Sequence, residues 1–132
     1  MEEPGTNIDA VREILECAES TGASVHVDHI NSTGGTFSME QSLNIIENAR
    51  LGGMDVTACV YPYDSWATYL DSARFDEGWQ KRFRITYGDL QLGGSGERLN
   101  ESSFRKYRDQ GKLAVAYAIP ESDVIAALKR PW

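Results

Sequence analysis

Residues 25–30, Val-His-Val-Asp-His-Ile, followed by Asn-Ser-Thr-Gly-Gly at 31–35, are the stretch that decides the fold. The first part is short and rich in β-branched side chains, which is typical of a strand. The second part has the polar, glycine-containing composition of a loop. The sequence therefore predicts a strand at 24–30, and the side chains that follow it stand at the carboxyl end of that strand.

A helix is predicted on each side of this strand. Residues 7–21 carry apolar side chains at helical spacing and end before Gly22, a residue that readily adopts the left-handed conformation of a helix stop. A second helix begins after Ser38, a candidate N-cap, and ends at the glycine pair 52–53. The strand at 24–30 is thus expected between two amphipathic helices.

Two further strands complete the predicted α/β fold. Residues 55–61 form a strand that Pro62 ends, because proline has no N–H to donate to a sheet. The helix between this strand and the first is typical of a βαβ crossover, which makes the two strands parallel. Residues 113–119 are almost wholly apolar, as in a strand covered on both faces, and are expected to add a third parallel strand.

The chain of 132 residues is long enough for a single domain with a modest core. We expect one α/β domain over 1–132, with two βα-type units in 1–63 and a final helix-strand-helix in 101–132. Between them, 64–100 shows no sustained period, and its aromatic side chains are expected to be core residues of an irregular insertion. A closed (β/α)8 barrel needs roughly 250 residues, about twice what this chain provides.

Composition and charge argue against several partners and locations. Thirteen Lys and Arg against twenty Asp and Glu give a net charge of −7, the wrong sign for binding nucleic acid or an anionic membrane surface. The two cysteines cannot make a disulfide framework, and the first residues do not resemble a secretion signal. No apolar run approaches the 18 or so residues that cross a bilayer. A cytoplasmic location without membrane or nucleic-acid partners is the expectation.

Two histidines near the end of the first strand are candidate metal ligands. Side chains alternate between the faces of a strand, so His26 groups with Asp28, whereas His29 points the other way. One ion therefore cannot take both imidazoles. His29 is the last residue before the polar loop, where an imidazole can face an open site, although a hydrogen-bonded structural histidine is the commoner case.

The second strand ends in Tyr61-Pro62-Tyr63, in the place that corresponds to His29. The two rings either cap a core or direct the Tyr61 hydroxyl toward whatever lies near His29. Cys59 lies on the same strand face as Tyr61; a buried thiol is its commonest meaning, although a thiolate would also bind zinc. The glycine-rich run 93–96 lacks the Lys-Ser or Lys-Thr of a phosphate loop, so a flexible loop is predicted there.

Two strand-end motifs carry a resemblance to a known family. Residues 25–32 and 54–63 resemble the central part of the N-acyl-D-amino-acid deacylases, the D-aminoacylase branch of the amidohydrolase superfamily. Residues 88–91, 96–99 and 116–120 are similar to the stretch before the final barrel strand, so the resemblance covers nearly the whole chain. It implies part of a metal-dependent (β/α)8 (TIM-type) barrel, in which zinc activates water to attack the amide of an N-acylated D-amino acid.

The resemblance also implies roles for individual residues. His29 corresponds to a zinc ligand, and Asn31, Ser32, Tyr61 and Tyr63 are expected to line the substrate site. Relatives place either histidine or tyrosine at the position of Tyr61, and often aspartate where Cys59 stands. The superfamily's His-x-His pair and its catalytic aspartate have no counterpart in the sequence, so no residue is assigned as catalytic.

A hydrolytic zinc site needs about three protein ligands, and the resemblance supplies one. The chain is therefore expected to be a segment of such a hydrolase, inactive alone, that meets a small-molecule N-acyl amino acid only within an intact enzyme. The alternative is a non-catalytic α/β module for association or small-ligand binding. In either case exposed sheet edges favour pairing with another copy, so a homo-oligomer is expected. If the family resemblance is chance, His29 is a structural histidine.

Overall fold

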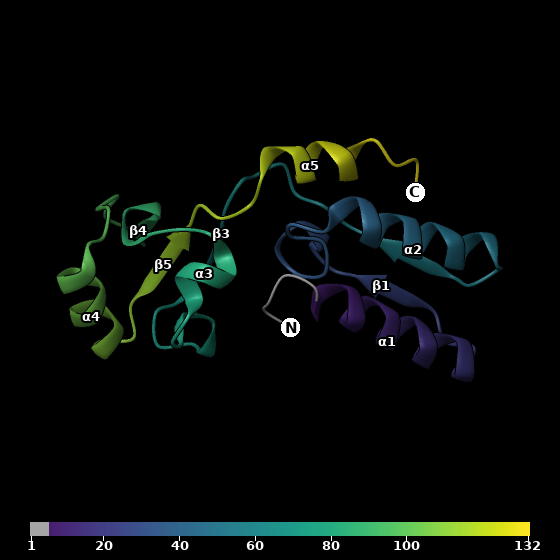
Figure 1. Ribbon diagram of the computed structural model, residues 1–132, viewed down its shortest axis with the longest axis horizontal. Helices are drawn as coiled ribbons and strands as arrows, with labels where there is room; N and C mark the ends of the chain where they lie inside the picture. The colour runs from purple at the N-terminus through teal and green to yellow at the C-terminus, as the bar shows by residue number, and fades with distance from the viewer. Residues whose placement is uncertain (1–5) are drawn as a thin grey trace. The chain divides into compact units, whose positions relative to one another are not determined.

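The computed structural model describes residues 6–132, which divide into two compact units (Figure 1). Unit 1 takes in the chain up to Tyr63 together with Ile119–Trp132, and unit 2 is Asp64–Ala118. The insertion predicted for 64–100 thus extends to Ala118. Nearly all of the segment 113–119, which was expected to be a strand beside the first two, therefore belongs to unit 2.

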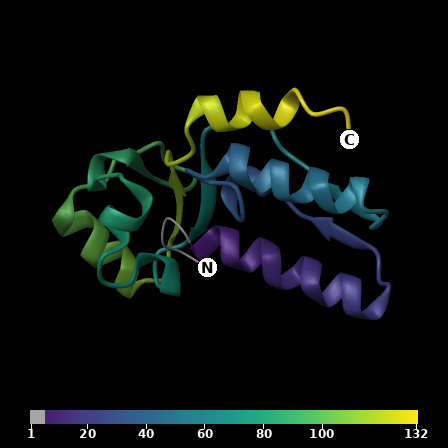
Figure 2. The same ribbon diagram turned by 45° about the vertical axis from the view of Figure 1, so that its right-hand side comes forward.

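Unit 1 is a βαβ arrangement with additional helices. Its elements are α1 (Thr6–Thr21), β1 (Val25–Val27), the 3-10 helix η1 (Ile30–Ser32), α2 (Met39–Leu51), β2 (Val56–Ala58) and α5 (Glu121–Leu128). β1 and β2 pair in parallel, with Val25 opposite Val56 and Val27 opposite Ala58, which confirms the predicted crossover. Figures 1 and 2 show α1 and α2 running along this strand pair, with α5 beside α2.

The core of unit 1 lies on one face of the β1–β2 pair. Val25, Val27 and Ala58 pack against buried apolar side chains of the helices, and Val56 is wholly buried among them. The helical members of this cluster are Val11, Leu15, Met39, Leu43, Ile46 and Ala127. The opposite face of both strands carries polar side chains that remain exposed. The sheet therefore separates an apolar face toward the helices from a polar, open face.

The strand predicted at 24–30 is shorter in the structure, because the backbone turns at His29. That residue adopts φ 34° and ψ 60°, a left-handed conformation that a residue with a side chain adopts at some cost, and η1 follows it. The turn aims two backbone N–H groups at Cys59: that of Ile30 donates to its carbonyl oxygen (2.9 Å), and that of His29 to its Sγ (3.0 Å). The end of β1 is thus tied to the end of β2.

Unit 2 is built around an antiparallel sheet with the order β3-β5-β4. Its elements are β3 (Trp66–Tyr69), η2 (Ala73–Phe75), α3 (Trp79–Phe83), η3 (Tyr87–Asp89), β4 (Leu90–Leu92), α4 (Glu101–Asp109) and β5 (Leu113–Ala116). The prediction that 113–119 is a third parallel strand is therefore wrong. β5 is the central strand of this sheet, between β3 and β4, and its side chains alternate between more and less exposed positions.

Aromatic side chains form the core of unit 2, as predicted for the irregular segment. Phe75 is 2% exposed, and its ring lies 5.4 to 5.8 Å from those of Trp66, Trp79 and Phe104. Edge-on and tilted ring pairs at such distances add to the stabilisation that burial provides. The core of unit 2 is thus formed mainly by aromatic side chains, whereas that of unit 1 is formed mainly by aliphatic ones.

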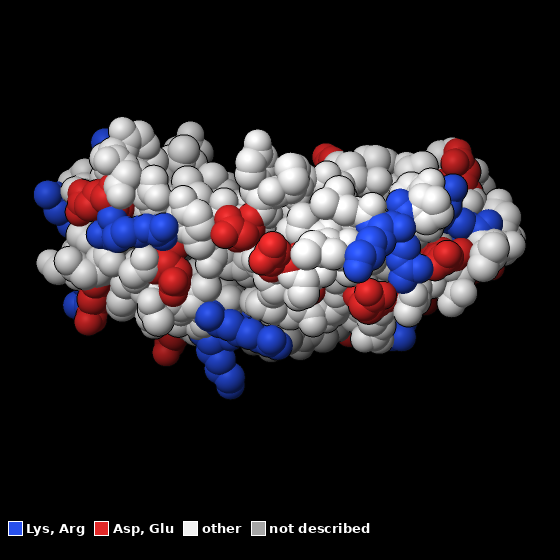
Figure 3. All heavy atoms as spheres, turned by 90° about the horizontal axis from the view of Figure 1, so that it is seen from above, with Lys and Arg blue, Asp and Glu red and all other residues white. Residues whose placement is uncertain are grey.

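The surface carries charges of both signs. On the face drawn in Figure 3, Lys and Arg side chains are interspersed with Asp and Glu. Arg130 illustrates this pattern, since its guanidinium pairs with Glu40 and Glu47 of α2. Among the helices of residues 6–132, none is long and apolar enough to span a membrane.

Candidate functional site at the carboxyl ends of β1 and β2

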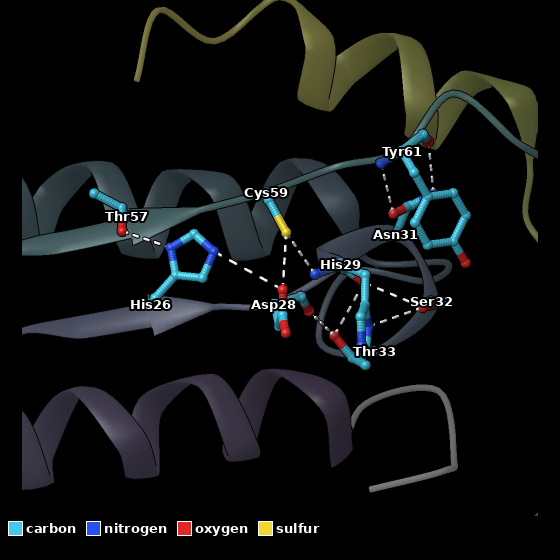
Figure 4. Close-up of polar contacts among 9 residues, drawn as sticks. All are labelled: His26, Asp28, His29, Asn31, Ser32, Thr33, Thr57, Cys59 and Tyr61. Atoms are coloured by element: carbon cyan, nitrogen blue, oxygen red, sulfur yellow. Dashed lines mark hydrogen bonds and ion pairs between the residues drawn. The ribbon is translucent and has the colours of Figure 1, made fainter.

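Three of the predicted site residues, His29, Tyr61 and Tyr63, come together after the ends of β1 and β2, and Figure 4 shows the first two of them. The ring centroids of His29 and Tyr61 are 6.5 Å apart, and those of Tyr61 and Tyr63 are 6.1 Å apart. The His29 and Tyr63 side chains are exposed, and that of Tyr61 is partly so. These rings therefore form an accessible aromatic edge at the end of the parallel strand pair.

Ser32 fixes the orientation of the His29 imidazole. Its hydroxyl lies 3.1 Å from His29 Nδ1 and 3.2 Å from the His29 carbonyl oxygen, within the turn of η1. Nε2 is the nitrogen on the opposite side of the ring. Ser32 is only 8% exposed, so it lies on the buried side of the imidazole. Its role in this structure is to position His29.

Asn31 is wholly buried and braces the second strand end. Its Nδ2 donates to the carbonyl oxygens of Tyr61 (3.0 Å) and Tyr63 (3.4 Å), and its Oδ1 accepts from the N–H of Tyr61 (3.5 Å). Both ends of the side-chain amide are thus engaged with backbone. Asn31 holds the segment that carries Tyr61, although the resemblance assigned it to the substrate lining.

Replacing Asn31 with alanine is expected to lower the free energy of unfolding by about 1–3 kcal/mol, because the backbone groups of Tyr61 and Tyr63 lose the partner that the buried amide provides. Urea denaturation followed by circular dichroism measures the change. Asn48→Ala is the matched control, since Asn48 is exposed on α2. A loss for Asn31→Ala no larger than that of the control would contradict the bracing role.

A second polar group lies on the exposed strand face beside these residues. His26 Nε2 is 3.9 Å from Asp28 Oδ1, and the Cys59 thiol donates to the same oxygen at 3.1 Å. His26 Nδ1 is 2.7 Å from Oγ1 of Thr57, its neighbour across the strand pair. The pairing of His26 with Asp28 on one face is as predicted. The approach of Cys59 was missed, because it depends on the register between two strands.

The hydrogen bond between Cys59 and Asp28 shifts the pKa of both groups. It lowers the pKa of Asp28 below 3.8, helped by His29 and His26 and opposed by desolvation. The same bond raises the pKa of Cys59 above 9.0, because the neighbouring carboxylate favours the thiol over the thiolate. The hydrogen bond between the Cys59 thiol and the Asp28 carboxylate is therefore strongest at a pH between the two pKa values. Its stabilising effect is lost as the pH rises through the folded pKa of Cys59 or falls through that of Asp28.

In chelator-treated protein, Cys59 is expected to react with iodoacetamide more slowly at neutral pH than an ordinary cysteine does, because its raised pKa lowers the fraction of the thiolate, which is the nucleophile. A Cys17→Ser background leaves Cys59 as the single thiol. Asp28→Asn in that background is expected to move the alkylation profile to lower pH, since it removes the carboxylate charge. Alkylation rates across a pH series measure this shift, and identical profiles would refute the contact.

A hollow of about 460 Å³ runs along α1 and β1 within unit 1. Its lining includes the apolar side chains of Val11, Ile14 and Val27 together with the polar residues His26, Asp28 and His29. An apolar hollow bordered by a few polar groups is the usual form of a small-ligand site. The polar strand ends therefore adjoin a space that a ligand or a further chain segment can fill.

Comparison of the chain with known sequences and structures shows which proteins share its fold. No family model and no curated protein sequence matches the chain. Two solved structures, an N-acyl-D-glutamate deacylase and a D-aminoacylase, share its fold. The chain thus has the fold of part of the proteins that its strand-end motifs resemble.

The first neighbour is the N-acyl-D-glutamate deacylase of Bordetella bronchiseptica, solved with zinc and a phosphonate inhibitor that mimics the tetrahedral intermediate. It matches 99% of this chain with a TM-score of 0.71 and 22% identity. The second is a D-aminoacylase, with a TM-score of 0.62 and 18% identity over 97% of the chain. The chain spans only 29% and 28% of these two proteins.

Proposed function

We propose that this chain is a segment of a metal-dependent amidohydrolase of the N-acyl-D-amino-acid deacylase type, equivalent to part of a (β/α)8 barrel. The observation that carries the proposal is the exposed imidazole of His29 at the carboxyl end of β1, beside Tyr61 at the end of the parallel strand β2. Barrel enzymes build their active sites at this end of the strands. The fold shared with a zinc-containing deacylase supports the same assignment.

Within such an enzyme, His29 would hold the zinc, and the ion would supply an activated water. Ser32 orients the imidazole through Nδ1, and Tyr61 and Tyr63 offer hydroxyl groups and ring surface to an N-acyl amino acid. Among residues 6–132, His29 belongs to no group of three candidate ligands, so it fits a zinc ion only as one member of a larger set. The chain alone is therefore expected to release no acyl group.

Substrate contact can be tested without turnover. We expect N-acetyl-D-glutamate to shift the NMR signals of His29, Tyr61 and Tyr63 more strongly than the L enantiomer does, with no release of acetate. His29→Gly is the control variant, because glycine accepts the left-handed backbone at this position while removing the ring. Equal effects of the two enantiomers, or shifts elsewhere only, would argue against the deacylase segment. Release of acetate would contradict the expectation that the chain is inactive by itself.

One observation favours the alternative, a non-catalytic module that associates with a second copy. Within the described residues, β1 and β2 pair only with each other, so each strand keeps an open edge, and β1 lines the hollow. Sedimentation velocity would then show dimers that Ile14→Lys, a change in the hollow, weakens. Leu51→Lys is the control, since Leu51 is exposed on α2 outside the hollow. A monomer at all concentrations would exclude this alternative.

A further inference from the structure

The exposed face of β1 and β2 carries four polar side chains in register. His26 stands opposite Thr57, and Asp28 and Cys59 follow at the next positions on the same face of the two strands. Their side chains point away from the apolar core, toward one another (Figure 4). Ligand atoms of His26, Asp28 and Cys59 all lie within 4.8 Å of one another, and this is the only such group of three or more in residues 6–132.

The spacing of these atoms is close to that of a tetrahedral metal site. Ligand distances of about 2.0–2.3 Å to zinc place the ligand atoms of a tetrahedral site about 3.3–3.8 Å apart. The sulfur of Cys59 and the nitrogen of His26 are 3.1 Å and 3.9 Å from Asp28 Oδ1. Adjustments of about half an ångström bring both of these separations to the tetrahedral value. Side-chain rotation on an exposed strand face supplies such movement.

Two further contacts orient the ligand atoms. Thr57 Oγ1 holds Nδ1 of His26, which turns Nε2 toward Asp28. When Nδ1 carries the proton in that bond, Nε2 presents a lone pair, the arrangement that metal-binding histidines use. The backbone N–H of His29 points at Cys59 Sγ from 3.0 Å, as donors to metal-bound thiolates do. The ligands are thus supported by partners that take no coordination position.

We propose that His26, Asp28 and Cys59 bind one divalent transition-metal ion of the zinc type, through Nε2, a carboxylate oxygen and Sγ. Imidazole and thiolate ligands select zinc-like ions over magnesium or calcium. The carboxylate and the thiolate together neutralise the two positive charges. On binding, the ion takes the place of the proton between Sγ and Asp28, and that proton is released to solvent. All three side chains are exposed, so the fourth position faces solvent.

This site differs from the one that the deacylase resemblance implies. The His29 imidazole is held by Ser32 and is no member of the group of three, and His29 contributes only its backbone N–H to the sulfur. The proposed site at His26, Asp28 and Cys59 therefore does not depend on the proposed deacylase function, and each can be tested without the other.

Cobalt titration of chelator-treated Cys17→Ser protein tests the proposal, because Cys59 is then the only thiol. We expect one equivalent of Co²⁺ to produce a sulfur-to-cobalt charge-transfer band, with one proton released per ion, and Zn²⁺ to abolish the band by competition. Cys59→Ser removes the band, and His26→Ala weakens binding. Thr57→Val, which keeps every ligand, is expected to lower the affinity about 10–100-fold.

His29→Gly is the decisive control, because it keeps the backbone donor to Cys59 but has no imidazole. The proposal requires the band and the proton release to persist in this variant. Absence of the band in Cys17→Ser protein would overturn the site, as would a band that His29→Gly abolishes. Circular dichroism checks that each variant is folded. If Cys59→Ser does not fold, the band in Cys17→Ser protein still assigns the thiolate, and His26→Ala still tests the imidazole.

Discussion

Phe75→Ala is expected to lower the free energy of unfolding of unit 2 by about 3–5 kcal/mol. The Phe75 ring is 2% exposed and contacts the rings of Trp66, Trp79 and Phe104, so its removal leaves a cavity bounded by rigid aromatic groups. Such groups cannot collapse into the space, which places the cost at the upper end for a core substitution. Chemical denaturation followed by tryptophan fluorescence measures it, since Trp66 and Trp79 adjoin the site.

Tyr69→Ala is the matched control for this substitution. Tyr69 is an aromatic residue of the same unit, but it lies on β3 with 59% of its surface exposed. Its replacement is expected to change the stability by less than about 1 kcal/mol, through strand propensity alone. Equal effects of the two substitutions would show that Phe75 is not at the centre of the unit 2 core.

Ile46→Ala is expected to lower the free energy of unfolding of unit 1 by about 2–5 kcal/mol. Ile46 has no exposed surface and belongs to the cluster that joins α1, α2 and the inner face of β2. Thermal and urea denaturation followed by circular dichroism measure the loss. The substitution is also expected to loosen the strand pair, so Co²⁺ binding by the polar face falls in parallel.

The control for Ile46 lies on the same helix. Leu51 is 82% exposed at the end of α2, so Leu51→Ala removes a similar side chain without opening a cavity. We expect a change of at most about 0.5 kcal/mol. A comparable loss in both variants would mean that the helix contributes through propensity and not through packing.

Local sequence signals predicted the framework of unit 1 well. Periodic apolar residues and helix stops located α1 and α2 to within a residue or two, and the crossover between them gave parallel strands. The strand at 24–30 was predicted too long, because nothing in the sequence marks His29 for a left-handed backbone. Such a conformation is imposed by its neighbours, here by the contacts that Cys59 and η1 make with the turn.

The same local sequence signals did not predict how strands that are distant in the sequence pair with one another. Leu113–Ala116 was expected to be parallel because it is apolar, yet it lies between β3 and β4 in a separate antiparallel sheet. The site shows the same limit. Alternation along one strand grouped His26 with Asp28, but only the register across β1 and β2 brings Cys59 to Asp28. The 31-residue offset between His26 and Thr57 is set by the whole crossover.

The pairing of Trp66 with Ala116 has a consequence for how this chain could be rearranged. Paired residues of antiparallel strands lie about 5 Å apart, and the chain enters unit 2 at Asp64 and leaves it at Ala118, two residues from this pair on either side. The two junctions therefore lie close together. Excision of the segment would leave ends that a short peptide bridges, so the segment can be deleted or transplanted as a cassette without stretching the chain that remains.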